Sequence, residues 1–348
     1  MKKIRVIIWG FGAMGQGMAD MLLDKKGVEI VGVCDLDPAL VGKRIVDVLN
    51  RSDVGCDVVV ETDSEALLEG READICLLAT DSFVKGAYPK IISVLEHGIN
   101  CISTAEEMAY PQASEPELAA KMDRIARTNG VTVLGTGINP GFIMDLLVLA
   151  LSGTMKDVTR IKAKRVNSLS PFGPAVMAEQ GVGIDLETFR EKKAKNELAG
   201  HVGFRESVNM IAAALGVELS GFAQQMEPIV TSVDRKSPYG EAKKGTLAGI
   251  HMTAQGKVDG EVMIDMHHPQ QIEPLSEGTH TGDYIEIKGT PEINMAITPE
   301  IDGGIGTIAI CVNMIPHVIN AKPGLRTMID LPVPRAILGD MRDQIDRS

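Results

Sequence analysis

The sequence predicts an α/β protein of two domains: a doubly wound parallel sheet first, then an α+β domain built on an open mixed sheet. Three observations lead to this. The chain has 348 residues, enough for two domains of ordinary size. Short apolar segments alternate with helical segments in its first part, which is the pattern of a parallel sheet. Longer strand-like segments with separate helices follow, as in α+β domains.

The first domain begins with residues 4–9, a short β-branched segment that fits a strand buried on both faces. From residue 13 apolar residues recur at helical spacing, and residues 29–34 form the second strand. The alternation continues with helices at 84–97 and 116–129 and with strands at 58–60, 75–79, 100–103 and 132–134.

In the second domain we expect helices at 185–195 and 204–215 and strands at 158–167, 228–234, 247–258, 260–268 and 284–288. Residues 304–320 are apolar and helical again, so they could pack back on the first domain. The predicted division is therefore 1–137 with 304–348 for the first domain, and 138–303 for the second.

The composition limits the function classes. Lys and Arg number 35 against 47 Asp and Glu, a net charge of −12, which disfavours binding to nucleic acid or anionic membranes. The first apolar stretch ends at Gly10, too short for a signal peptide or a membrane span. The five cysteines are widely spaced and lack metal-site spacing, which predicts free thiols, no metal and a cytoplasmic protein.

Three glycines stand between the first strand and the first helix, in the segment Gly10-Phe11-Gly12-Ala13-Met14-Gly15. In this context the first permits a tight turn, the second lets the backbone approach a pyrophosphate, and the third allows close packing of helix and strand. The helix N-terminus offers free N–H groups to the phosphates. The segment predicts a Rossmann-type fold that binds a dinucleotide.

Asp35 ends the second strand, where a carboxylate accepts hydrogen bonds from both hydroxyls of an adenosine ribose and repels a 2′-phosphate. This favours NAD over NADP, although NADP stays possible, with Asp37 as the fallback acid. Ligands of such sheets lie outside the carboxyl ends of the strands, which selects the loops 80–82, 104–107 and 136–141. From these ends we take Ala79, Thr80, Asp81 and Thr104 as further cofactor contacts.

Longer motifs carry a family resemblance over about residues 3–341: IIWGFGAMG, LLATDSF, CISTAEEMAYP, GTGINPGFIMDLL, NSLSPFGPAVM, AGHVGF, VDRKSPYG, HPQQIEP and GGIGTIAICVNMIP. The chain resembles the 2,4-diaminopentanoate dehydrogenase family. The resemblance implies NAD(P)-dependent oxidative deamination of 2,4-diaminopentanoate to 2-amino-4-oxopentanoate and ammonia, in anaerobic ornithine breakdown. It also implies a homodimer. Dihydrodipicolinate reductase is a more distant relative by fold, but the lysine and Ser-Gly-Thr segment that should follow its paired histidines are absent after His268.

Related amine dehydrogenases place a glutamate in the loop after residues 100–103, where this chain has Glu106 and Glu107. A carboxylate there can deprotonate an amine, stabilise the iminium cation and activate water. Neighbouring residues point in different directions, and the resemblance favours Glu106 as the catalytic residue. Both could instead form an acidic pair at a helix start.

The amino-acid end of such a substrate needs polar partners, and the candidates are Asn139, Asn167, Ser168, Ser170 and His201, each of which could equally serve a structural turn. Arg165 and Arg235 could pair with the carboxylate, but we expect them to be exposed. His268 is expected to cap a strand. Two alternatives stay open: a dehydrogenase of another diamine or simple amine, and a protein that senses NAD(H) without turnover.

Overall fold

The computed structural model describes residues 2–70 and 72–346 and divides into two compact units. Unit 1 comprises Met1–Phe142 and Asp302–Ser348, and unit 2 comprises Ile143–Ile301. The chain first passes from unit 1 to unit 2 after Phe142 rather than after residue 137. The loop that begins at residue 136 still belongs to unit 1, because the Ile138 N–H donates to Thr307 Oγ1 of that unit at 3.2 Å.

Unit 1 is built on a seven-stranded sheet of order β15-β6-β5-β4-β1-β2-β3, in which every pair is parallel. Its strands are β1 (Ile4–Trp9), β2 (Val28–Cys34), β3 (Val60–Glu61), β4 (Ile75–Leu78), β5 (Asn100–Ser103), β6 (Thr132–Gly135) and β15 (Gly324–Arg326). Its helices are α1 (Ala13–Leu23), α2 (Ile45–Val48), α3 (Ser64–Gly70), α4 (Val84–Glu96), α5 (Pro116–Thr128) and α10 (Gly303–Ile319), with short 3₁₀ turns η1 (Glu106–Ala109), η2 (Pro111–Ala113) and η4 (Met341–Gln344).

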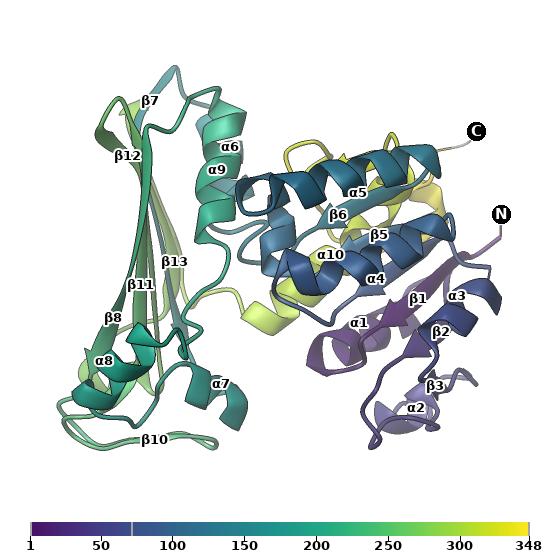
Figure 1. Ribbon diagram of the computed structural model, residues 1–348, viewed down its shortest axis with the longest axis horizontal. Helices are drawn as coiled ribbons and strands as arrows, with labels where there is room; N and C mark the ends of the chain where they lie inside the picture. The colour runs from purple at the N-terminus through teal and green to yellow at the C-terminus, as the bar shows by residue number, and fades with distance from the viewer. Residues whose placement is uncertain (1, 71, 347–348) are drawn as a thin grey trace. The chain divides into compact units, whose positions relative to one another are not determined.

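Helices cover both faces of this sheet, which is why its central strands are apolar throughout. α1 packs against α10, and α4 packs against α5, with α4 and α10 both contacting β5 (Figure 1). All four residues of β4 are buried. α1 and α10 approach closely at Gly17, where an added Cβ would lie 2.1 Å from Ile308 Cδ1. The doubly wound fold class is confirmed.

The predicted strand at 58–60 is wrong in extent. Only Val60 and Glu61 form β3 in the sheet. Val59 makes an isolated antiparallel bridge to Arg44, and the Val58 carbonyl accepts from the N–H of Ile45. The preceding residues are therefore held by the segment around α2 and not by the sheet.

Unit 2 contains a six-stranded mixed sheet of order β14-β13-β7-β12-β11-β8, parallel between β7 and β12 and antiparallel elsewhere. The strands are β7 (Asp157–Ser168), β8 (Gly221–Val230), β11 (Leu247–Val258), β12 (Glu261–Gln271), β13 (Gly282–Thr290) and β14 (Ile293–Ile297), and β9 (Arg235–Lys236) pairs with β10 (Glu241–Ala242) separately. The helices are α6 (Leu146–Ser152), α7 (Pro174–Glu179), α8 (Leu186–Ala194) and α9 (Phe204–Leu215), and η3 (Pro274–Glu277) is a 3₁₀ turn.

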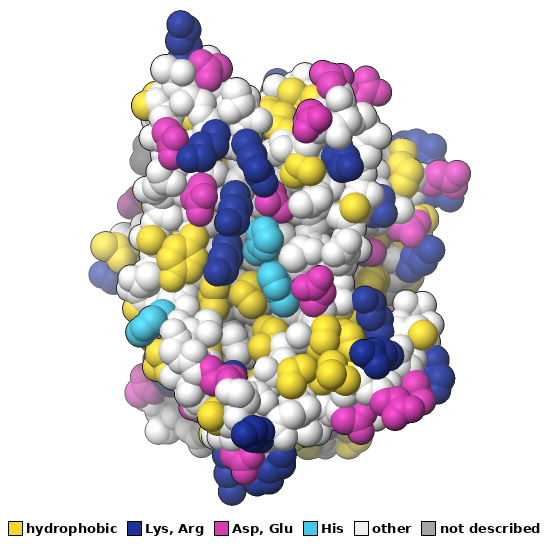
Figure 2. Space-filling model, turned by 90° about the vertical axis from the view of Figure 1, so that its left-hand side faces the viewer, with side chains coloured by type: hydrophobic (Ala, Val, Ile, Leu, Met, Phe, Trp, Pro, Cys, Tyr) yellow, Lys and Arg dark blue, Asp and Glu magenta, His cyan; other side chains and the backbone are white. Residues whose placement is uncertain are grey.

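The two faces of the unit 2 sheet differ. α6 contacts β7 and α9 contacts β11, so helices cover one face. Partly exposed polar side chains, among them Lys162, Lys164, His251 and His267, alternate with buried ones along the strands. Figure 2 shows a row of Lys and Arg side chains beside two histidines on the face that this view presents. The open mixed sheet of the α+β domain is confirmed.

The strand predicted at 228–234 is wrong. The observed strand β8 starts at Gly221 and ends at Val230. It lies at the sheet edge and contains the exposed polar residues Gln224, Gln225 and Glu227, so it lacks the apolar run from which a strand is recognised. After it the chain turns, and Thr231 Oγ1 donates to the Val233 carbonyl at 2.8 Å.

Candidate active site

The glycine turn between β1 and α1 accepts no larger residue at two positions. Gly10 has φ +95°, and a Cβ there would lie 2.5 Å from the Ala79 carbonyl oxygen. A Cβ at Gly15 would lie 1.9 Å from the Gly10 carbonyl oxygen. At Gly12 a Cβ would meet nothing within 4 Å, and no side chain caps the N-terminus of α1 at this residue. The turn therefore presents open backbone N–H groups, as a site for a dinucleotide pyrophosphate requires.

Asp35 is bound to the glycine turn itself. Its Oδ2 accepts from the Phe11 N–H at 2.5 Å, and its Oδ1 accepts from the Asp37 N–H at 2.8 Å. The carboxylate is partly exposed and retains lone pairs for further donors. Asp35 thus fixes the turn and already uses the Phe11 N–H, and its contact with a ribose stays a prediction.

A cavity of about 330 Å³ lies beside this turn in unit 1. The residues that line it come from α1, from the loops after β4, β5 and β6, and from α10: Met14, Ala79, Thr80, Asp81, Ser82, Thr104, Glu106, Gly137, Asn139, Pro140 and Thr307. The carboxyl ends of parallel strands thus bring together seven residues that were selected separately in the sequence: Met14, Ala79, Thr80, Asp81, Thr104, Glu106 and Asn139.

Four lining residues were not among the predicted site residues. Ser82, Gly137 and Pro140 belong to the loops that the strand-end rule selects. Thr307 comes from α10, far along the chain, and its Oγ1 accepts the Ile138 N–H. The available signal was a hydroxyl among the apolar residues in the first part of this helix.

The Asp81 side chain is held in place by α4. Lys90 Nζ lies 2.6 Å from Asp81 Oδ2 and also donates to Thr80 Oγ1 at 3.0 Å. Gly86 leaves room for this arrangement, because a Cβ there would lie 2.4 Å from Asp81 Oδ1. The ammonium neutralises the Asp81 carboxylate at the edge of the cavity and fixes the loop that carries it.

Glu106 and Glu107 occupy different environments although they are adjacent. The Glu107 Oε2 accepts the Val84 N–H at 2.8 Å, which caps the first turn of α4. Glu106 lines the cavity instead. Burial raises the pKa of the Glu106 carboxyl above its usual value, with the Glu107 charge adding to the rise, while the backbone N–H and the Ser82 side chain oppose it. A carboxyl with a raised pKa in a cavity suits proton transfer near neutral pH.

The substrate candidates of unit 2 belong partly to a buried polar cluster on the helix-covered face of the sheet. His268 Nε2 lies 3.0 Å from Asn167 Oδ1, and the His268 ring packs edge-on against His201 at 4.7 Å between centroids. Burial lowers the pKa of His201 to about 3, with the nearby Arg165 charge contributing, and it lowers the pKa of His268 as well. Both imidazoles are therefore neutral. His268 lies inside β12 and does not cap it, so that expectation is wrong.

Ser168 and Ser170 have structural partners. Ser168 Oγ accepts the Ser170 N–H at 3.2 Å, and Ser170 Oγ accepts the Glu273 N–H at 2.9 Å. Their hydroxyl hydrogens are left to other acceptors. A ligand contact by either residue stays a prediction.

Arg165 and Arg235 are both buried, which corrects the expectation that they are exposed. Arg165 Nη1 pairs with Asp283 Oδ1 at 2.6 Å, and Arg165 also donates to the Ile301 carbonyl at 2.5 Å. Arg235 pairs with Glu277 and donates to the Gln271 side chain at 2.7 Å. Each guanidinium thus already has a carboxylate partner within unit 2.

Residues 2–70 and 72–346 contain no group of three or more His, Cys, Asp or Glu side chains placed to hold a metal ion. In the same ranges, no helix has both the length and the apolar character of a membrane span.

Comparisons with known proteins find a matching family and similar sequences and structures. A family model described as the 2,4-diaminopentanoate dehydrogenase C-terminal domain matches residues 142–347. The curated 2,4-diaminopentanoate dehydrogenase of Acetoanaerobium sticklandii is 58% identical over 346 residues, covering 99% of this chain and 98% of that protein.

Among solved structures, the amine dehydrogenase of Mycobacterium smegmatis superposes with a TM-score of 0.85 at 27% identity, covering 97% of this chain and 98% of that one. A dihydrodipicolinate reductase from Paenisporosarcina sp. TG-14, with a TM-score of 0.50 at 15% identity over 93% of this chain and 97% of its own, shares the fold alone. By its family model and its sequence identity, the chain belongs to the 2,4-diaminopentanoate dehydrogenase family.

Proposed function

We propose that the protein is a nicotinamide-dependent dehydrogenase that converts 2,4-diaminopentanoate to 2-amino-4-oxopentanoate and ammonia. The observation that carries the proposal is Glu106, a carboxyl with a raised pKa in a cavity next to a glycine turn. The relative from Acetoanaerobium sticklandii bears the name of this activity at 58% identity. The proposal places the reaction in ornithine breakdown, the role that the resemblance implies.

The cofactor would be held by the glycine turn, by the strand-end loops and by Asp35. Open N–H groups at Gly12 and at the start of α1 would bind the pyrophosphate, and Asp35 the adenosine ribose. The nicotinamide ring, when bound, accepts a hydride from the substrate carbon. Because Asp35 is a carboxylate, it repels a 2′-phosphate, and we propose NAD as the preferred cofactor, with NADP possible.

Glu106 would carry the proton chemistry. The C4 ammonium of the substrate first loses a proton to the Glu106 carboxylate, since only a neutral amine can release hydride from its carbon. Glu106 then passes this proton to solvent and is a carboxylate again. As hydride leaves C4, positive charge develops on the nitrogen, and the Glu106 carboxylate stabilises it. Water then adds to the iminium carbon while the Glu106 carboxylate accepts a proton from it, which gives a carbinolamine. Glu106 returns this proton to the amine nitrogen, and the carbon–nitrogen bond breaks as the hydroxyl proton passes to Glu106, which releases ammonia and the ketone.

The amino-acid end of the substrate needs hydrogen-bond donors and acceptors. We propose Asn139, Asn167, Ser168, Ser170 and His201 for this role. The polar cluster of unit 2 supports the choice of Asn167 and His201, because neutral imidazole and amide groups can donate to a carboxylate and accept from an amine.

The test is to mix the purified protein with NAD and 2,4-diaminopentanoate and to follow reduced cofactor by absorbance and ammonia in parallel. One ammonia is expected for each reduced cofactor, and the Glu106→Gln variant should bind NAD but form both products at least about a hundredfold more slowly. Reduction with another diamine and not with 2,4-diaminopentanoate would reassign the substrate. Binding of NAD without reduction in any substrate panel would instead indicate a sensor.

We also propose a cytoplasmic homodimer. The buried free thiols of Cys34, Cys76, Cys101 and Cys311 support a reducing compartment. The open, partly exposed face of the unit 2 sheet supports pairing between two copies (Figure 2). Light scattering after size-exclusion chromatography gives the mass, and a monomer at micromolar concentration would contradict the dimer.

A further inference from the structure

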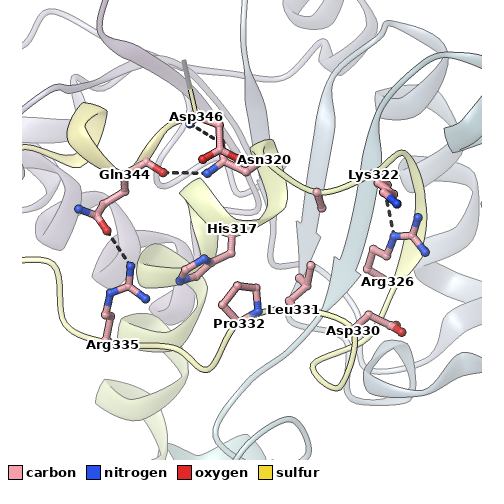
Figure 3. A pocket seen from close by; sticks show the side chains of 11 residues that line it. His317, Asn320, Lys322, Arg326, Asp330, Leu331, Pro332, Arg335, Gln344 and Asp346 are labelled. Carbon is pink, nitrogen blue, oxygen red and sulfur yellow. Dashed lines mark hydrogen bonds between the residues drawn. The ribbon is translucent and has the colours of Figure 1, made fainter. Parts of the chain in front are cut away.

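Unit 1 contains a second and larger cavity, of about 610 Å³, which shares no lining residue with the cavity beside Glu106. It lies at the carboxyl end of α10, where the chain passes to β15 and on to the C-terminal segment. Its lining residues come from these three parts of the chain: His317, Asn320, Ala321, Lys322, Arg326, Asp330, Leu331, Pro332, Arg335, Gln344 and Asp346 (Figure 3).

Three cationic side chains of this cavity form no salt bridge in the described part of the chain, although the Arg326 charge acts on the Asp123 carboxylate from a longer distance. Within residues 2–70 and 72–346, Lys322, Arg326 and Arg335 form no salt bridge, since no carboxylate oxygen of that part of the chain lies within 4.0 Å of their charged nitrogens. In the same chain Arg5 and Arg51 are each paired with two or more carboxylates. Against the two carboxylates of the lining, Asp330 and Asp346, these three cations leave an excess of one positive charge, in a protein of net charge −12.

The guanidinium groups are held in position by neutral acceptors. Arg326 Nε and Nη2 donate to the carbonyls of Lys322 and Pro323 at 2.9 and 3.0 Å. Arg335 Nη2 donates to Gln344 Oε1 at 2.8 Å, as Figure 3 shows. These hydrogen bonds orient each guanidinium group without neutralising its charge, and Nη1 of both arginines stays available for an anion. The lining also contains two carboxylates. Asp330 already accepts from the Thr327 N–H and hydroxyl, and Asp346 is exposed.

A buried imidazole gives an independent indication of a ligand. His317 is 8% exposed and lines the cavity, yet its imidazole ring forms no hydrogen bond with any residue of the described ranges. Burial and the Arg335 charge lower its pKa, so the ring is neutral and carries one donor and one acceptor. The His317 ring nitrogens are not among the fully buried side-chain atoms that lack a partner, so they reach the solvent of the cavity, where they can bond to a ligand.

We propose that this cavity is a binding site for a small organic polyanion, with its phosphate or carboxylate groups on Arg326, Arg335 and Lys322 and with His317 hydrogen-bonded to its body. Leu331 and Pro332 supply the apolar wall that an organic ligand requires. The cavity volume suits a metabolite rather than a lone ion. This proposal does not rest on the proposed function, because the two cavities share no residue.

A structural role is the competing explanation. Lys322 and Arg326 follow the C-terminus of α10, where cations interact favourably with the helix dipole. That role accounts for neither Arg335 nor the unpartnered His317. It also predicts no ligand, so a binding experiment separates the two explanations.

The experiment measures binding of pyrophosphate and of citrate by calorimetry to the protein saturated with NAD, which keeps the anions from the glycine turn. The test variant is Arg326→Gln with Arg335→Gln. The matched control is Arg124→Gln, an exposed arginine of α5 without a salt bridge in the described ranges. Bound NAD, measured by fluorescence, checks that each variant is folded, and the single variant Arg335→Gln is used if the double variant loses NAD binding.

We expect at least one of the two anions to bind with a Kd below about 1 mM, to bind at least tenfold more weakly to the test variant, and to bind unchanged to the control. Tighter binding of pyrophosphate assigns a phosphate ester, and tighter binding of citrate assigns a polycarboxylate. Binding should weaken as sodium chloride is raised. Absence of binding up to about 10 mM for both anions, or equal binding by wild type and test variant, would overturn the proposal.

Discussion

The adjacent residues Glu106 and Glu107 allow a sharp test, because the structure separates a chemical role from a structural one. Changing Glu106 to Gln keeps the size and the hydrogen-bonding capacity of the side chain and removes its charge. General base catalysis contributes about 10² to 10⁴ in rate, so kcat should fall at least about a hundredfold, which corresponds to about 2.7 kcal/mol of barrier. The folded state should not be weakened, since burial already disfavours the charged form of Glu106.

Changing Glu107 to Ala should have the opposite pattern. The substitution removes the acceptor of the Val84 N–H at the start of α4, and loss of such a cap costs about 0.5–2 kcal/mol. The midpoint of urea unfolding should drop while kcat stays within a fewfold of wild type. Glu107→Gln is the matched control, because its amide oxygen can still accept the Val84 N–H.

The assay is steady-state formation of reduced cofactor, with NAD affinity measured by fluorescence and stability by urea unfolding. An inactive Glu107→Gln variant beside a nearly normal Glu106→Gln variant would refute the assignment of roles. Retained activity in both would place the base elsewhere in the cavity, with Asp81 the next carboxylate to test.

Four further outcomes are expected. Asp35→Ser should shift the ratio of kcat/KM from NAD toward NADP, and a wild type that already prefers NADP tenfold, or by about 1.4 kcal/mol, would contradict the assignment. On the acid side, the pH profile of kcat/KM should show an apparent pKa above 4.5, the ordinary value for glutamate, because the base must be deprotonated and burial raises the pKa of Glu106. An apparent pKa at or below 4.5 would argue for another base. Burial lowers the pKa of His201 from 6.5 to about 3, so the free energy of unfolding is highest above pH 6.5 and falls by about 1.4 kcal/mol per pH unit as the pH drops toward 3. In the His201→Asn variant the free energy of unfolding, measured with urea, should depend less steeply on pH, and an equal dependence would contradict the prediction. Arg235→Met should destabilise unit 2 by about 1–3 kcal/mol, because the buried Gln271 Oε1 loses its Arg235 donor while the Glu277 carboxylate keeps its hydrogen bonds from Ser232 and Thr231; an unchanged midpoint of thermal unfolding would show that the Arg235 contacts are dispensable.

The sequence was most informative where one local pattern determines an element. The strand at residues 4–9 and the strand at 100–103 have the predicted bounds, because each is a short apolar segment followed by a turn or a polar loop. The helix at 204–215 also has its predicted bounds, with Gly203 and Gly216 in left-handed conformations at its two ends. Periodicity and glycine placement are properties of a single stretch of chain, so they can be interpreted without the fold.

The same local approach fails where partners lie far apart in the chain. Nothing near Arg165 reveals that it pairs with Asp283, and nothing near Thr307 reveals that it meets the loop at Ile138. The buried arginines look like ordinary charged residues until the mixed sheet brings their partners to them. The polar edge strand β8 was missed for a related reason, since its pairing with β11 and not its own composition holds it in the sheet.

The roles of Glu106 and Glu107 show how far the strand-end rule extends. It selects the loop correctly, because the carboxyl ends of parallel strands meet at one edge of the sheet. It cannot tell which of two adjacent carboxylates faces the cavity. That depends on the 3₁₀ turn η1 and on the nearby first turn of α4, which takes up Glu107.

The return of the chain to unit 1 has a consequence for how the protein folds during synthesis. β6 receives its outer neighbour β15 only from residues 324–326, and α1 receives α10 only from residues 303–319. While the ribosome is making the intervening residues 143–301, the nascent first segment carries an unpaired strand edge and an uncovered apolar helix face. Its native state is thus reached only after nearly the whole chain has been made. Fragments that end before α10 should aggregate for this reason, and a stop codon late in the message is as damaging to the first half of the protein as to the last.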